Sequence, residues 1–231
     1  KMCQLFDCTL DDLVQGDLTN REAPAKMQIA TTTRPSDIFG YDEHMNRFAT
    51  KISTGAACPL IGSAIAIIFF SLGDPTGSGF TNPPLTENVG GALGMLFIAI
   101  GIVLCLIQVI PAGLAHSEFV RTHPYIEDFY STEQKTRARQ SFTYQLVFGI
   151  LSVLSGVVFV ILFAETSLET VIGVPVMMLF IAIGAFFIVH GSMILSKTNL
   201  TNYNMAAGEA LSASEIKSLD IPTERKNELL S

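Results

Sequence analysis

Long apolar stretches alternate with polar segments along this chain, and the alternation predicts its architecture. Four stretches contain no Lys, Arg, Asp or Glu: 57–73, 90–115, 142–164 and 171–195. In the last two, the segments from Leu146 to Ala164 and from Val171 to Val189 are apolar all round. A helix with no polar face is buried in protein or in lipid, whereas a water-facing helix carries a polar side. The pattern therefore predicts helices surrounded by lipid.

The lengths of these stretches match the thickness of a membrane. A bilayer core about 30 Å thick needs roughly 20 helical residues. The first stretch reaches that length when the uncharged residues from Ile52 to Ala56 join it. We therefore predict an all-α fold, a four-helix transmembrane bundle with short cytoplasmic helices beside it. The spans are expected at about 52–73, 90–115, 142–164 and 171–195.

Local patterns predict where some helices begin and how they pack. Ser131-Thr132-Glu133-Gln134 has the spacing of a capping box, so a helix is expected to start there and continue into the third span. Ser36 is expected to cap a helix from Asp37 to Lys51. Pro111 is expected to loosen the second span. Small residues at four-residue spacing predict close helix approach, within the chain or between chains: Gly62 and Ala66, Gly90 and Gly94, Ser152 and Gly156.

The charged residues give the predicted helices an orientation. They make up 15% of the chain, against about 25% in soluble domains, and all lie outside the four apolar stretches. Every Lys and Arg precedes the first span, lies between the second and third, or follows the fourth. The other two loops carry only acidic charges. Because basic loops stay in the cytoplasm, both termini and the central loop are expected there, in a multi-pass protein of the cell membrane.

Composition and motifs argue against several functions. The net charge of −7 does not fit a polybasic nucleic-acid surface within this chain. HExxH, GxSxG, Walker A and GxGxxG patterns are missing from the sequence, so we predict neither an enzyme nor a cofactor site. His116 and His123 lie seven residues apart without a neighbouring cysteine, a pattern that does not favour a metal site.

Two polar residues inside the apolar stretches form a candidate intramembrane site. His190 is the side chain there that titrates near neutral pH, so a proton relay or a sensor is one interpretation. The alternative is a neutral histidine bonded to a neighbouring helix or to water. Gln108 lies in the second span and is expected to bond across helices, which by itself implies only packing.

The first 17 residues resemble the end of a DNA-binding domain. The string Leu5-Phe6-Asp7-Cys8-Thr9-Leu10-Asp11-Asp12-Leu13, with Gly16-Asp17 after it, is similar to the last two helices of Cro/repressor-type helix-turn-helix domains of the XRE family. The recognition helix of that family lies upstream of this string. The resemblance therefore implies a DNA-binding domain that is mostly missing here, with no DNA-contacting residue in this chain.

Two further strings resemble the membrane part behind such domains in regulators of Gram-positive bacteria. They are Tyr41-Asp42-Glu43-His44-Met45-Asn46-Arg47-Phe48 and His123-Pro124-Tyr125-Ile126-Glu127-Asp128-Phe129-Tyr130. Together the resemblances imply a helix-turn-helix remnant, a linker with a juxtamembrane helix, a membrane domain and a cytoplasmic tail, at residues 1–17, 18–51, 52–195 and 196–231.

The leading hypothesis is a membrane-tethered transcription regulator, with spans that anchor an upstream DNA-binding domain and sense a signal. Its expected partners are the lipid bilayer, DNA through the missing segment, a second copy in a homodimer and an unspecified signal ligand. The alternative is a small transporter, channel or accessory membrane subunit without DNA binding. That alternative needs polar residues along a path, and only His190 and Gln108 are candidates.

Overall fold

The computed structural model describes residues 36–74, 83–166, 168–210 and 223–230, which contain helices and no strand. The helices are α3 (Tyr41–Gly73), α4 (Glu87–Thr122), α5 (Thr132–Phe163), α6 (Val174–Lys197), α7 (Leu200–Ala210) and α9 (Thr223–Leu230). A π-helical turn, η1 (Glu169–Gly173), leads into α6. Four helical segments are long and apolar enough to cross a membrane: Tyr41–Gly73, Glu87–Thr122, Thr132–Phe163 and Glu169–Lys197. The all-α, four-span prediction is confirmed, and the chain is a multi-pass membrane protein.

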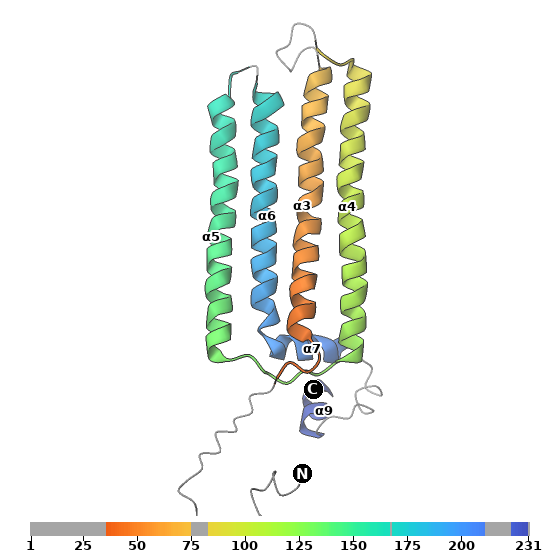
Figure 1. Ribbon diagram of the computed structural model, residues 1–231, viewed down its shortest axis with the longest axis vertical. Coiled ribbons are helices and arrows are strands. Elements are labelled where there is room, and N and C mark those ends of the chain that lie inside the picture. The colour runs from red at the N-terminus through yellow and green to blue at the C-terminus, as the bar shows by residue number, and fades with distance from the viewer. Residues whose placement is uncertain (1–35, 75–82, 167, 211–222, 231) are drawn as a thin grey trace, which may run out of the picture. The chain divides into compact units, whose positions relative to one another are not determined.

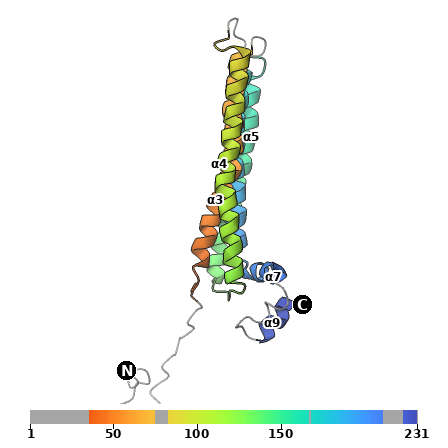
Figure 2. The ribbon, with the colours of Figure 1, turned by 90° about the vertical axis from the view of Figure 1, so that its right-hand side faces the viewer.

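The four long helices stand side by side in one row. In Figure 1 their order across the row is α5, α6, α3 and α4. Helix α5 packs against α6, α6 against α3, and α3 against α4. The view along the row in Figure 2 shows a single layer. Large apolar side chains are exposed on these helices, among them Leu96, Val103, Leu151 and Val158, as lipid-facing helices require.

Glycines bring the helices of each hairpin into backbone contact. A Cβ atom on Gly62 of α3 would lie 2.7 Å from the carbonyl oxygen of Phe97 and 3.0 Å from the Cα atom of Gly101. In the α5–α6 hairpin, a Cβ on Gly184 would lie 2.7 Å from the carbonyl oxygen of Gly149. The predicted close approach at small residues is therefore confirmed within the chain. Dispersion between closely packed backbones stabilises such contacts where lipid supplies no hydrophobic drive.

The helix starts agree with one of the two capping predictions. Ser131 accepts a hydrogen bond from the backbone N–H of Gln134, and the Gln134 side chain accepts one from the N–H of Ser131, which completes the predicted capping box. The prediction for Ser36 is wrong, because α3 begins at Tyr41. Asp37 takes the capping role, and its two carboxylate oxygens accept the N–H groups of Tyr41 and Asp42 at 2.9 and 2.8 Å. A carboxylate also favours the positive end of the helix dipole.

The predicted loosening at Pro111 does not end the helix, and it stays a prediction. Helix α4 continues through this proline to Thr122. A proline removes one backbone hydrogen bond, whereas ending the helix at that depth would leave several carbonyl groups unpaired beside lipid. Continuing the helix is therefore the less costly solution.

Candidate functional site

One end of the row carries most of the polar side-chain contacts. Helices α3 and α5 begin there, α4 and α6 end there, and the segment 123–131 and α7 lie beside them (Figure 1). Helix α3 begins about 11 residues before Ile52, the first residue of its apolar stretch, so its first turns carry polar residues. We call the contact region of α3, segment 123–131, the end of α6 and the start of α7 the junction.

A buried lysine is the centre of the junction. The ammonium group of Lys197 donates to Asp42 Oδ1 at 2.8 Å and to Asn46 Oδ1 at 2.7 Å. Its side chain is 11% exposed, whereas that of Asp42 is 41% exposed. The hydroxyl of Tyr130 donates to the same Asp42 oxygen at 2.7 Å, and the hydroxyl of Tyr41 donates to the carbonyl of Lys197 at 3.1 Å. These bonds connect α3 to the end of α6 and to segment 123–131.

An apolar core lies next to this network. Its buried members come from three parts of the chain: Tyr41, Met45, Ile126 and Leu200. Phe48, Phe119, Phe129, Tyr130 and Tyr203 surround them. The ring of Tyr41 meets that of Tyr203 edge to face, with centroids 5.1 Å apart, a geometry that favours aromatic pairs.

Helix α7 holds segment 123–131 in place. The Asn204 side chain accepts from the backbone N–H of Ile126 and donates to its carbonyl, both at 3.0 Å. The Tyr203 hydroxyl donates to the carbonyl of His123 at 2.8 Å. Burial raises the pKa of Tyr203, and burial followed by the hydrogen bond to Asp42 raises that of Tyr130. Both phenols therefore stay neutral and keep donating at physiological pH.

We expect Asn204→Ala to release segment 123–131 from α7. Two hydrogen bonds are lost, each worth about 1 kcal/mol net, so exchange of the Ile126 amide should accelerate about tenfold or more. Hydrogen–deuterium exchange read by mass spectrometry measures this. Asn202→Ala on the same helix is the matched control, because the Asn202 side chain makes no bond to this segment within the described chain. Equal exchange in both variants would show that the Asn204 contacts do not hold the segment.

Three histidines gather on the same side of the junction. His44 Nε2 and His116 Nδ1 are 3.3 Å apart, and the two rings stack at 5.5 Å. His123 Nδ1 is buried and has no hydrogen-bond partner among the described residues. The described part of the chain contains no group of three His, Cys, Asp or Glu residues placed to hold a metal ion. The ring of His44 stacks on Phe119 and that of His116 stacks on Phe48, with centroids 4.2 and 4.3 Å apart.

The two residues predicted for an intramembrane site do not meet. His190 Nδ1 lies 2.8 Å from Gln145 Oε1 in the α5–α6 hairpin, and its ring stacks on Phe186. Gln108 donates to the sulfur of Cys58 at 3.4 Å in the α3–α4 hairpin. Each side chain bonds to the neighbouring helix, as the packing alternative requires. A sensing or proton-relay role for His190 stays a prediction.

The junction contains residues that the search for catalytic and membrane motifs did not select. Asp42, Asn46 and Lys197 are common residue types in polar segments, and Lys197 lies 155 residues from Asp42. A signal was nevertheless present, because the two strings at 41–48 and 123–130 face each other here. They supply Tyr41, Asp42, Asn46, Ile126 and Tyr130 to one contact region.

Comparison with protein families, with curated proteins and with solved structures finds no match to the chain.

Proposed function

We propose that the protein is a membrane-anchored transcription regulator whose helices hold an upstream DNA-binding domain beside the bilayer. The sequence support is the XRE-like string in residues 1–17, which lie outside the described part of the chain. The structural support is the junction. The leader, by which we mean the part of the chain that precedes α3, continues directly into that helix, and the first turn of α3 is bonded to the end of α6 and to segment 123–131.

This connection offers a physical route from membrane to DNA. Tyr41 and Asp42 touch parts of the chain that belong to both hairpins and to their connecting segment. A signal that changes the packing of the spans would therefore shift the start of α3 and the leader attached to it. In a homodimer, such a shift would change the spacing of two DNA-binding domains and so their joint affinity for paired half-sites.

The proposal requires the junction to face the cytoplasm. All described cations of the four long helices lie toward the junction end of the row: Arg47, Lys51, Arg121, Lys135, Arg137, Arg139 and Lys197. The opposite end has acidic residues only, among them Glu87 and Glu165. Under the positive-inside rule this distribution supports a cytoplasmic junction, and we propose both termini on the same side.

Cysteine labelling tests this orientation. In a chain whose four native cysteines are replaced by alanine, we expect Thr166→Cys to react with an impermeant maleimide in intact cells. Thr201→Cys on α7 should react only after the membrane is permeabilised. Both threonines are exposed, so accessibility of the side chain does not differ between them. The reverse labelling pattern would contradict the cytoplasmic assignment.

Chromatin immunoprecipitation of the full-length gene product, tagged at its C-terminus in its own host, tests the regulator itself. The expected result is enrichment of discrete promoter regions from protein that is crosslinked at the membrane. Removing the residues upstream of the XRE-like string, while keeping the spans, should abolish the enrichment without changing membrane insertion. Recovery of no DNA above an untagged strain would reject the proposal and favour the transporter or accessory-subunit alternative.

A further inference from the structure

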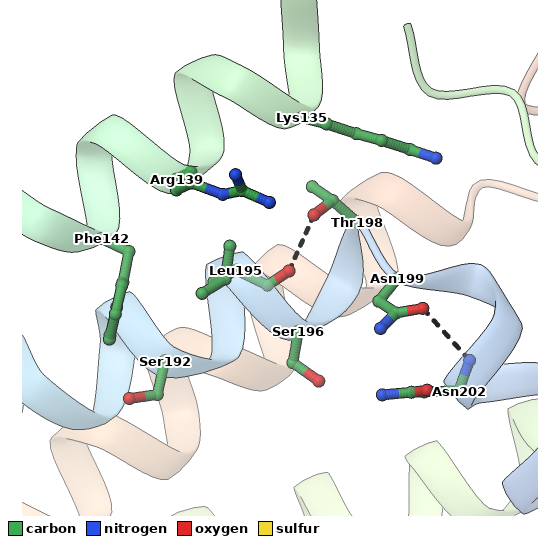
Figure 3. Close-up of a pocket in the computed structure, with 9 residues that line it drawn as sticks. All are labelled: Lys135, Arg139, Phe142, Ser192, Leu195, Ser196, Thr198, Asn199 and Asn202. Carbon is green, nitrogen blue, oxygen red and sulfur yellow. Dashed lines mark hydrogen bonds between the residues drawn. The ribbon is translucent and has the colours of Figure 1, made fainter. Parts of the chain in front are cut away.

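A second polar feature lies at the junction end, on the outer side of the α5–α6 hairpin. It is a pocket of about 530 Å³, within the range of roughly 300–1,000 Å³ common for small-ligand sites. Its walls come from the start of α5, the end of α6 and the start of α7 (Figure 3): Lys135, Arg139, Phe142, Ser192, Leu195, Ser196, Thr198, Asn199 and Asn202. No member of this lining is acidic, and two are cations.

The two cations occupy one face of α5. Lys135 and Arg139 are four residues apart, so they lie one above the other on the helix. In Figure 3 the Arg139 side chain extends from α5 toward the end of α6. Its guanidinium forms no ion pair with any carboxylate of the described residues. A fork of guanidinium donors without an acceptor is suited to a phosphate or carboxylate.

Further donors face the same space. The hydroxyl of Ser196 and the amide of Asn202 make no side-chain hydrogen bond within the described chain, so both can donate to a ligand. Ser192 and Thr198 already donate, to the carbonyls of Ile188 and Leu195. The pocket also includes the first turn of α7, where the helix dipole favours a negative charge.

The position of the pocket indicates where its ligand comes from. Lys135 and Arg139 precede the apolar stretch that begins at Phe142, and Leu195 ends the apolar stretch of α6. The pocket therefore crosses the boundary between lipid tails and water, with Lys135 and Arg139 on the water side and Phe142, Ser192 and Leu195 within the apolar stretches. A free anion would use only the charged part, whereas a phospholipid would also use the apolar residues.

We propose that this pocket binds the phosphate group of an anionic phospholipid, with Arg139 and Lys135 as its main charged contacts. Phe142 and Leu195 contact the glycerol and the first carbons of the acyl chains. Lys135 is paired with Asp128 at the outer edge of the pocket, but both side chains are more than 40% exposed. An exposed ion pair of this kind contributes little free energy, so the phosphate can replace Asp128 as the partner of Lys135 at low cost.

Native mass spectrometry of the full chain in detergent, titrated with phosphatidylglycerol, tests this assignment. We expect one saturable lipid, retained far better than phosphatidylcholine, whose choline neutralises the phosphate. Arg139→Gln should weaken retention about tenfold, because it removes charge-assisted hydrogen bonds. Arg137→Gln is the matched control, because this substitution removes the same charge from the same helix at a residue that does not line the pocket.

Asp128→Asn is expected to change the affinity for phosphatidylglycerol in the opposite direction. It frees Lys135 while keeping the Oδ1 acceptor for the Tyr130 N–H, so phosphatidylglycerol should bind more tightly. Equal weakening by Arg139→Gln and Arg137→Gln would overturn the pocket, because it would indicate general attraction to a basic surface. Saturable binding of inorganic phosphate that displaces the lipid, with no selectivity among lipids, would overturn the phospholipid as the ligand. Circular dichroism and gel filtration confirm that each variant is folded.

Discussion

Replacing Gly101 with leucine is expected to separate α3 from α4. A Cβ atom at this position would lie 2.9 Å from the carbonyl oxygen of Cys58, 3.2 Å from the Cα of Gly62 and 3.3 Å from the Cα of Pro59. All three neighbours are backbone atoms, so no side-chain rotation relieves the overlap. Overpacking of a protein core typically lowers the free energy of unfolding by about 1–3 kcal/mol. Displacing the backbone along the whole contact between α3 and α4, which we call the seam, should lower it by about 3 kcal/mol or more.

The native thiols report this separation. Cys58 and Cys105 are partly buried, on the two helices that the substitution forces apart. In a chain whose Cys3 and Cys8 are replaced by alanine, a thiol-reactive dye should therefore label Cys58 and Cys105 at a lower temperature in Gly101→Leu than in the parent. Gly113→Leu on the same helix is the control, because a Cβ there has no atom within 4 Å. Both substitutions gain the same helix propensity, about 1 kcal/mol. An equal shift of the labelling temperature in both variants would therefore contradict the predicted separation of α3 from α4.

Asp42→Asn is expected to destabilise the junction by about 2 kcal/mol. Removing one partner of a buried ion pair costs about 3–5 kcal/mol, and the partial exposure of Asp42 reduces that figure. The buried ammonium of Lys197 would keep only neutral acceptors, from Asn46 and the new amide. Thermal unfolding of the purified chain, followed by circular dichroism, measures the loss.

A double-mutant cycle separates this ion pair from other effects. Adding Lys197→Met to Asp42→Asn removes the stranded charge, so the double variant should be less destabilised than the sum of the single variants. Glu43→Gln is the control, because its partner Arg47 is exposed and such surface pairs are worth about 0–1 kcal/mol. Strict additivity of Asp42→Asn and Lys197→Met would mean that the two groups do not interact in solution.

The sequence was sufficient for the four spans but not for the true ends of the helices. Uncharged runs reveal the part of a helix that lipid surrounds, because a charge at that depth is costly. Helix α3 starts eleven residues before Ile52, since contacts with Leu200 and Tyr203 stabilise its polar turns. Such contacts connect distant parts of the chain and leave no periodic signal. The local bonds from Asp37 to the N–H groups of Tyr41 and Asp42 were missed because they depend on a helix start at Tyr41, which those distant contacts determine.

The order of the helices in the row and the junction were also beyond sequence reasoning. Small residues recur in every span, so spacing alone does not show that α6 lies between α5 and α3. Polar residues in apolar runs drew attention to His190 and Gln108, and each proved to bond to the adjacent helix. Asp42 and Lys197 lie among other charged residues, and only the fold reveals which carboxylate reaches which amine.

A row of four helices encloses no interior. The two hairpins are closed by backbone contact at Gly62 and Gly184, and the seam between α3 and α6 contains an apolar crevice of about 370 Å³. Apart from Thr54, the residues that line this crevice are apolar side chains of α3 and α6. Sliding of one hairpin against the other along this crevice would change the neighbours of Ala57 and Ala182, and it would also have to break the bonds that Lys197 makes with Asp42 and Asn46.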